Sequence, residues 1–139
     1  MTKQETLDAF AAICKNTMLE TLDIKFTDFN VEEGWVKATM PVTSKVHQPM
    51  GLLHGGATAA LAESLGSASS LLFLDPKKQA PVGVELSCNH VSSIRSGMVT
   101  GTAQIVHKGR SSHLWQIRVE DENGKLISLC KLLNFIKDI

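Results

Sequence analysis

The sequence lacks an excess of charge of either sign, because its 139 residues include 14 basic and 14 acidic side chains. It also lacks a block of basic residues interleaved with aromatic ones, the composition typical of surfaces that bind nucleic acid. We therefore expect no nucleic acid among its partners.

Cysteine is scarce and poorly placed for disulfides or zinc. The three cysteines, Cys14, Cys88 and Cys130, are an odd number, are widely spaced and form no Cys-x-x-Cys pair. This pattern argues against a disulfide framework and a zinc site, and favours a reducing compartment. We interpret the three as buried small hydrophobic residues, and we expect no metal.

Targeting and membrane segments are also missing. The first ten residues, MTKQETLDAF, lack the apolar core of a secretory signal, and no apolar run approaches the length of a membrane span. These absences predict a cytoplasmic protein with no membrane partner. The length and the 43% hydrophobic content fit one domain over residues 1–139 with a real core.

What the sequence does contain is one long segment almost free of charge. Residues 46–74 read VHQPMGLLHGGATAALAESLGSASSLLFL, and Glu63 is the one formally charged residue from Pro49 to Leu74. A helix that is apolar or small all round is typical of a buried helix. We therefore predict a buried helix that carries one carboxylate held for chemistry. The alternative is an ordinary surface glutamate, as most glutamates are.

The start of this helix has features of an anion-binding site. Gly55 and Gly56 stand where the helix would begin, and the first N–H groups of a helix have no partners within it. Gly55 has no Cβ to block approach, and the helix dipole favours negative charge at this end. Gln48 and His54 lie just upstream. His54 has two interpretations, a catalytic base or a residue that orients the loop.

The rest of the chain predicts strands around this helix. A short amphipathic helix is expected over residues 4–15. Alternating apolar and polar residues predict six strands, over residues 22–29, 35–41, 82–90, 98–107, 113–120 and 125–136. In the third of these strands the alternation places on one apolar face Val82, Val84, Leu86, Cys88 and His90.

Short turns separate the last four strands, which predicts a meander with antiparallel pairing. The predicted architecture is α+β, with one antiparallel sheet wrapped around one long central helix. Such a sheet has open edges, and the helix has more apolar surface than one sheet face covers. We therefore expect the chain to associate with a second copy.

The segment HQPMGLLHGGATAALAESLGS resembles the active-site segment of hotdog-fold acyl-CoA thioesterases, in the 4-hydroxybenzoyl-CoA thioesterase/PaaI-like family. The element order, the VGVEL strand start and the HKGR turn extend the resemblance over nearly the whole chain. It implies a hotdog fold and hydrolysis of an aryl- or medium-chain acyl-CoA. Coenzyme A would be part of the substrate, with no separate cofactor, and a homodimer would be the minimal unit of a homotetramer.

The resemblance also implies roles for individual residues. Glu63 would be the nucleophile or general base, and the Gly55 N–H would donate to the thioester carbonyl. The implied catalytic set is completed by Gln48, His54 and Ser67. The residues that the resemblance places along the substrate are His90, His107, Lys108, Gly109 and Arg110. From the residues alone, a satisfied core histidine is the commoner outcome for His90 on an apolar strand face.

Spacing adds an inference that does not depend on the resemblance. Gly55 and Glu63 are eight residues apart, about 12 Å along one helix. A carboxylate and an oxyanion donor that serve one carbonyl should lie closer together. We therefore predict that a Gly55 works with the Glu63 of a neighbouring subunit.

The alternatives to a thioesterase are a non-catalytic acyl- or CoA-binding module and a hotdog hydratase or dehydratase.

Overall fold

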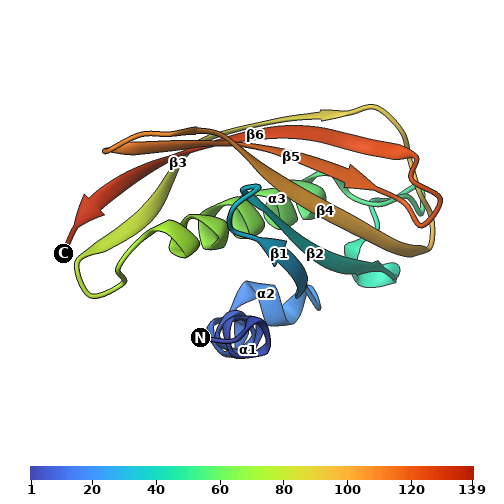
Figure 1. The fold of residues 1–139 in the computed structure, drawn as a ribbon. Coiled ribbons are helices and arrows are strands. Elements are labelled where there is room, and N and C mark those ends of the chain that lie inside the picture. Colours follow the sequence, from blue (N-terminus) through green and yellow to red (C-terminus); the bar gives the residue numbers. More distant parts are fainter.

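One antiparallel sheet curves around one long helix in the computed structural model, which describes residues 1–139 (Figure 1). The long helix is α3, Gly55–Ser69, continued by the 3-10 turn η2, Ser70–Phe73. The strands are β1 (Lys25–Asn30), β2 (Trp35–Val42), β3 (Gln79–His90), β4 (Gly97–Lys108), β5 (Ser112–Glu120) and β6 (Leu126–Asp138). The α+β architecture expected from the sequence is confirmed.

Two short helices precede the sheet and a 3-10 turn, η1 (Ser44–Val46), follows β2. Helix α1, Lys3–Cys14, packs on β1 through Phe10, whose ring stacks on Phe26 with centroids 4.6 Å apart. Helix α2, Met18–Thr21, occupies the chain just before the place where the first strand was expected to begin. Strand β1 therefore starts three residues later than the alternation predicts.

The strand order is β1-β2-β4-β5-β6-β3, with every neighbouring pair antiparallel. The predicted meander holds for β4, β5 and β6 and is wrong for β3, which pairs with β6 at the edge of the sheet. Residues 91–96 therefore carry the chain past two strands. Six extended residues reach roughly 20 Å, and three strand spacings need about 14 Å. No turn residue in the sequence distinguishes this crossing from a hairpin.

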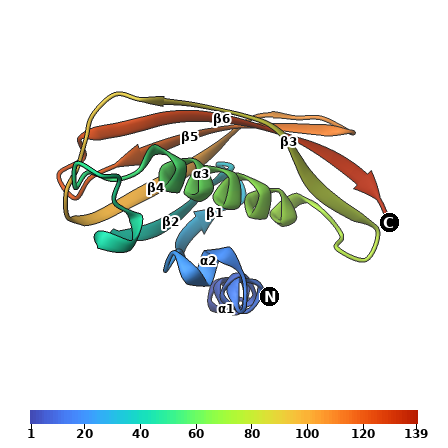
Figure 2. The ribbon, with the colours of Figure 1, turned by 180° about the vertical axis from the view of Figure 1, so that it is seen from behind.

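The core lies between α3 and the concave face of the sheet (Figure 2). The inner face of α3 buries Leu61, Ala62 and Leu65 completely. Gly66 allows the helix to approach β6 closely, because a Cβ at this position would lie 2.6 Å from Leu132 Cδ2. Glycine inside a helix costs roughly 0.5–1 kcal/mol relative to alanine, so close packing here offsets a real local penalty.

The predicted apolar face of β3 is wrong over its first half. The register of β3 against β6 shifts between Gly83 and Glu85, which is a β-bulge. A bulge adds one residue and reverses which side chains face inward. Val82 and Val84 are consequently 40% and 44% exposed, although Leu86 and Cys88 pack against the core as expected. Gly83 takes the inward position that the alternation assigns to a valine.

A buried polar cluster holds the C-terminal end of α3 to the sheet. Ser70 Oγ accepts from Trp115 Nε1 and Asn134 Nδ2, both at 2.9 Å, and lies 2.9 Å from His113 Nδ1. Asn134 Nδ2 also donates to the Gly66 carbonyl at 3.1 Å, one of the last four carbonyls of the helix. Asn134 Oδ1 is buried without a hydrogen-bond partner.

The cluster determines the protonation of His113. Both lone pairs of the Ser70 hydroxyl are taken by donors that cannot accept, so its single proton is directed to His113 Nδ1. His113 is 2% exposed, and burial is the main reason that its pKa is lowered, with Lys108 and His107 adding to the effect. The neutral imidazole is therefore the form that fits the fold.

This arrangement predicts a pH dependence of stability. A histidine whose pKa is lowered by folding binds a proton more readily when unfolded, so its stabilising contribution is complete above the ordinary value of about 6.5. The contribution is lost as the pH falls through that value towards the folded pKa. We expect urea unfolding between about pH 5 and pH 8 to show that the free energy of unfolding falls as the pH is lowered, and that it falls more steeply for the wild type than for His113→Gln. Parallel curves for the two proteins would contradict the prediction.

Candidate functional site

The first turn of α3 presents one backbone donor without a partner. His54 is the N-cap, and its Nδ1 accepts from the Gly56 N–H at 2.7 Å. The His54 carbonyl accepts from Ala57 and Thr58 at 3.0 and 3.2 Å. Gly55 N–H makes no hydrogen bond within the chain. The helix therefore begins with one free donor at the positive end of its dipole.

Close approaches by two imidazole rings explain why both positions are glycine. A Cβ at Gly55 would lie 2.7 Å from His90 Nε2, and a Cβ at Gly56 would lie 2.9 Å from His54 Nδ1. Any other residue at Gly55 would push His90 away. Since His54 Nδ1 accepts a hydrogen bond, the neutral ring carries its proton on Nε2. The geometry thus favours a capping role for His54, with Nε2 as a donor and not as a base.

Gln48 is oriented by the loop that precedes α3. Its Oε1 accepts from the backbone N–H groups of Met50 and Leu52, which assigns the oxygen and leaves the amide NH2 free to donate. Gln48, Gly55 and His90 line one cavity of about 400 Å³. Two donors of the type that stabilise a carbonyl oxyanion, an amide NH2 and a backbone N–H, therefore face the same space.

Glu63 lies on the outer face of α3, and it is exposed. The expectation of a helix buried all round is wrong for the single chain, because the residues on this face are small and nothing else in the chain covers them. Glu63 and Ser67 line an open groove of about 490 Å³, bordered by Met18 of α2 and Leu86 of β3. The carboxylate is therefore accessible from outside the chain.

Gly83 is a site residue that the sequence reasoning missed. A Cβ at Gly83 would lie 3.4 Å from both Glu63 Oε2 and Ser67 Oγ, so the two side chains rest over a bare stretch of β3 backbone. The bulge in β3 creates this contact by turning Gly83 inward. A single glycine inside a strand pattern is a known sign of a bulge or of close approach to the backbone, and was the available signal.

The structure thus places five of the predicted catalytic and substrate-binding residues in two groups. Gln48, Gly55 and His90 share the cavity at the start of α3, and Glu63 and Ser67 share the groove two turns further along. The two groups do not meet in one chain. This separation agrees with the spacing argument, which assigns the two groups that serve one substrate to different subunits.

The basic turn between β4 and β5 lies at the opposite end of α3. Lys108 and Arg110 line a shallow depression of about 410 Å³ with Phe73 of η2, whose ring centroid is 4.6 Å from Lys108 Nζ. A Cβ at Gly109 would lie 2.7 Å from His107 Nε2 and 3.0 Å from the Ser112 carbonyl, so a larger residue here would displace the exposed His107 ring. Within one chain, this turn and Gly55 are separated by the 15 residues of α3, about 22 Å.

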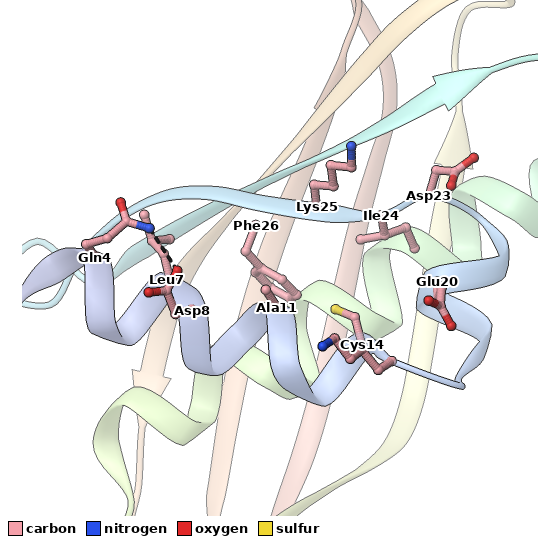
Figure 3. A pocket seen from close by; sticks show the side chains of 11 residues that line it. Gln4, Leu7, Asp8, Ala11, Cys14, Glu20, Asp23, Ile24, Lys25 and Phe26 are labelled. Atoms are coloured by element: carbon pink, nitrogen blue, oxygen red, sulfur yellow. Dashed lines mark hydrogen bonds between the residues drawn. The ribbon is translucent and has the colours of Figure 1, made fainter.

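A hollow of about 520 Å³ lies between α1 and β1 and holds no nucleophile suited to catalysis (Figure 3). Its one thiol, Cys14, is buried and donates to the Phe10 carbonyl. Burial, and to a lesser degree Glu20, raise the pKa of the Cys14 thiol. Figure 3 shows a surface bond from Gln4 to Asp8 at its rim. We attribute the hollow to the packing of α1.

Two further features bear on the expected chemistry. No three His, Cys, Asp or Glu side chains gather in a geometry that could hold a metal ion. None of the helices is long and apolar enough to span a membrane.

Known proteins with similar sequences and structures include thioesterases. The family model described as Thioesterase superfamily matches residues 50–128. The proofreading thioesterase EntH of Klebsiella pneumoniae is 44% identical over 94% of this chain and 93% of its own length. The 1,4-dihydroxy-2-naphthoyl-CoA hydrolase of Escherichia coli is 40% identical over 94% of each chain.

Solved structures agree. A mutant of thioesterase PA1618 from Pseudomonas aeruginosa superposes with a TM-score of 0.92 at 40% identity, covering 96% of this chain and 94% of that one. Thioesterase HI1161 from Haemophilus influenzae gives 0.90 at 36% identity, covering 95% and 90%. With the sheet wrapped around a central helix and a family match over more than half of its length, this chain belongs to the thioesterase superfamily and is a hotdog-fold thioester hydrolase.

Proposed function

We propose that the enzyme hydrolyses acyl-CoA thioesters with an aryl or medium-chain acyl group, releasing the carboxylic acid and the coenzyme A thiol. The observation that carries the proposal is the free Gly55 N–H, which shares a cavity with the Gln48 amide at the start of the helix that also bears Glu63. One similar protein is named for a naphthoyl-CoA substrate, an aromatic acyl thioester. That name supports the aryl class for this chain.

The residues divide the chemistry between them. The Gly55 N–H donates to the thioester carbonyl, and its hydrogen bond strengthens as the oxygen gains charge; one such donor is worth roughly 3–4 kcal/mol in the transition state. The Gln48 amide is a neutral second donor beside it. Glu63 attacks the carbonyl carbon or removes a proton from the attacking water, with Ser67 placed to orient the water or the carboxylate.

A complete site requires two chains in this proposal. The groove beside Glu63 is open, and its wall of small residues on α3 can accept the start of a second α3 at close range. The free edge of β3 offers unpaired backbone groups for a second β3. A homodimer is then the minimal unit, and we propose a homotetramer as the assembled form.

Two other features complete the proposal. The His107–Arg110 turn of one chain lies along the coenzyme A part of the substrate, with Lys108 and Arg110 near its phosphates. The three cysteines are free thiols, which favours a reducing compartment, so we assign the enzyme to the cytoplasm.

The competing functions predict different results in one assay. A hotdog hydratase or dehydratase needs a histidine and an acid placed for α-proton abstraction, whereas the helix here combines Glu63 with Ser67. A binding module would hold acyl-CoA without releasing thiol. A thiol-release assay over a panel of acyl-CoA esters separates the proposed hydrolysis from both alternatives, since only hydrolysis frees the coenzyme A thiol.

The first catalytic prediction concerns Glu63. Glu63→Gln removes the charge and keeps the shape, so the fold and the binding of coenzyme A should persist and turnover should fall by roughly 10²-fold or more. Glu32→Gln, in the exposed turn between β1 and β2, is the matched control and should leave turnover unchanged. Turnover of the Glu63 variant close to wild type on the best substrate would refute the assignment.

The second prediction concerns the basic turn between β4 and β5. Arg110→Ala should raise KM for a full acyl-CoA and hardly affect a short acyl-pantetheine thioester, because only the former carries the phosphates. Arg118→Ala removes an exposed arginine from β5 and should change neither value. Steady-state kinetics with both substrates decide the matter, and equal losses on the two would contradict a phosphate contact.

The third tests the shared site by subunit exchange between Gln48→Ala and Glu63→Ala. In a mixed two-fold dimer, one site receives both defects and the other receives none. Random exchange at equal amounts makes about half of the dimers mixed, so about a quarter of all sites become wild type. Activity should rise well above the mean of the parents. Verified exchange without a rise would end the shared-site model and leave Glu63 as a candidate catalyst.

A further inference from the structure

His90, which lines the cavity with Gly55, is bonded to a buried serine on the neighbouring strand. His90 and Ser128 face each other across β3 and β6, and His90 Nδ1 lies 3.0 Å from Ser128 Oγ. Ser128 is completely buried. Its Oγ also lies 3.1 Å from the Asn89 carbonyl and 3.5 Å from Cys130 Sγ. The serine therefore has three neighbours and only one proton.

Only one of these neighbours is unable to donate. A backbone carbonyl oxygen is purely an acceptor, so the hydroxyl proton of Ser128 is directed to Asn89. The lone pairs of Ser128 Oγ then face His90 Nδ1 and the Cys130 thiol, both of which can donate. In this arrangement every hydrogen-bonding capacity of the buried hydroxyl is used.

We propose that Ser128 is a positioning residue that holds His90 as the Nδ1–H tautomer, with the lone pair of Nε2 directed to the substrate cavity. The Nε2 side of the ring packs against Gly55, where a Cβ would lie 2.7 Å away. A free backbone donor and a ring acceptor therefore stand side by side in the cavity. The tautomer of His90 is then the opposite of that of His54, whose Nδ1 accepts from the Gly56 N–H and whose proton is on Nε2.

The consequence for the reaction rests on the proposed function. With Nδ1–H committed to Ser128, His90 exchanges protons with a bound molecule only at Nε2, next to the carbonyl oxygen that Gly55 holds. The ring can accept a hydrogen bond from a water or an amide N–H of the substrate. In the other tautomer Nε2 would carry a proton and could accept nothing. Ser128 thus determines that Nε2 of His90 accepts a hydrogen bond from the bound molecule and does not donate one.

The wild-type protein provides the first measurement. Two-bond 1H–15N correlation spectra of the wild-type protein at alkaline pH, with His90 assigned by comparison with His90→Gln, report which ring nitrogen carries the proton. We expect a protonated Nδ1 and an unprotonated Nε2 for His90. The reverse assignment would overturn the proposal, and this measurement needs neither a substrate nor turnover.

Variants of Ser128 provide the second measurement. Ser128→Ala should shift His90 towards the Nε2–H tautomer and lower kcat by roughly tenfold or more, as a histidine held in the wrong tautomer loses its function. Ser128→Thr keeps the hydroxyl and should restore both properties. Cys130→Ala removes the other contact of Ser128 and should leave the tautomer of His90 unchanged.

The two readouts separate the inference from the proposed function. An unchanged tautomer in Ser128→Ala, or a changed tautomer with wild-type kcat, would overturn the positioning role. If no acyl-CoA ester is hydrolysed by the wild type, the proposed function fails, and the spectra still decide whether Ser128 sets the tautomer of His90.

Discussion

The position of α3 against the sheet is the constraint on which the rest of the structure depends. Large apolar side chains such as Leu61 and Leu65 fill the inner face of the helix, and Gly66 lets the backbone come close to Leu132 of β6. Asn134 then secures the Gly66 carbonyl and Ser70. The hydrophobic contacts supply most of the free energy, but they are not directional. The directional bonds at the C-terminal end fix the axial position, and with it both ends of the helix.

The candidate site is built where side chains are missing. The His90 ring lies where a Cβ of Gly55 would be, and the His54 ring lies where a Cβ of Gly56 would be. The side chains of Glu63 and Ser67 lie close to the position that a Cβ of Gly83 would take. In each place, a polar side chain of the candidate site occupies the volume that a Cβ would need. The glycines therefore position functional groups by close contact, and the loss of conformational entropy on folding is greater for each of them than for other residues.

Sequence reasoning found the part of the site that is local in the chain. The glycine start, the single carboxylate and the eight-residue spacing can all be read along one helix, because helical geometry is regular. The bulge in β3, its pairing with β6 and the inward turn of Gly83 depend on which strand becomes its neighbour. Alternation in β3 does not reveal that partner. The tautomers of His54 and His90 likewise depend on contacts with Gly56 and Ser128 that only the folded chain defines.

The expectation that Glu63 lies on a buried helix took this local reasoning one step too far, because Glu63 is exposed in the single chain. A helix with small residues on its outer face is apolar enough to be buried, but one curved sheet covers only its inner face. A carboxylate in an open groove remains hydrated, whereas electrostatic catalysis is effective where water is excluded. Under the proposed function, the cover comes from outside this chain. A second copy that places its own Gln48 and Gly55 over the groove would exclude water and supply the missing oxyanion donors in a single docking event, so dehydration and assembly of the site would be the same step.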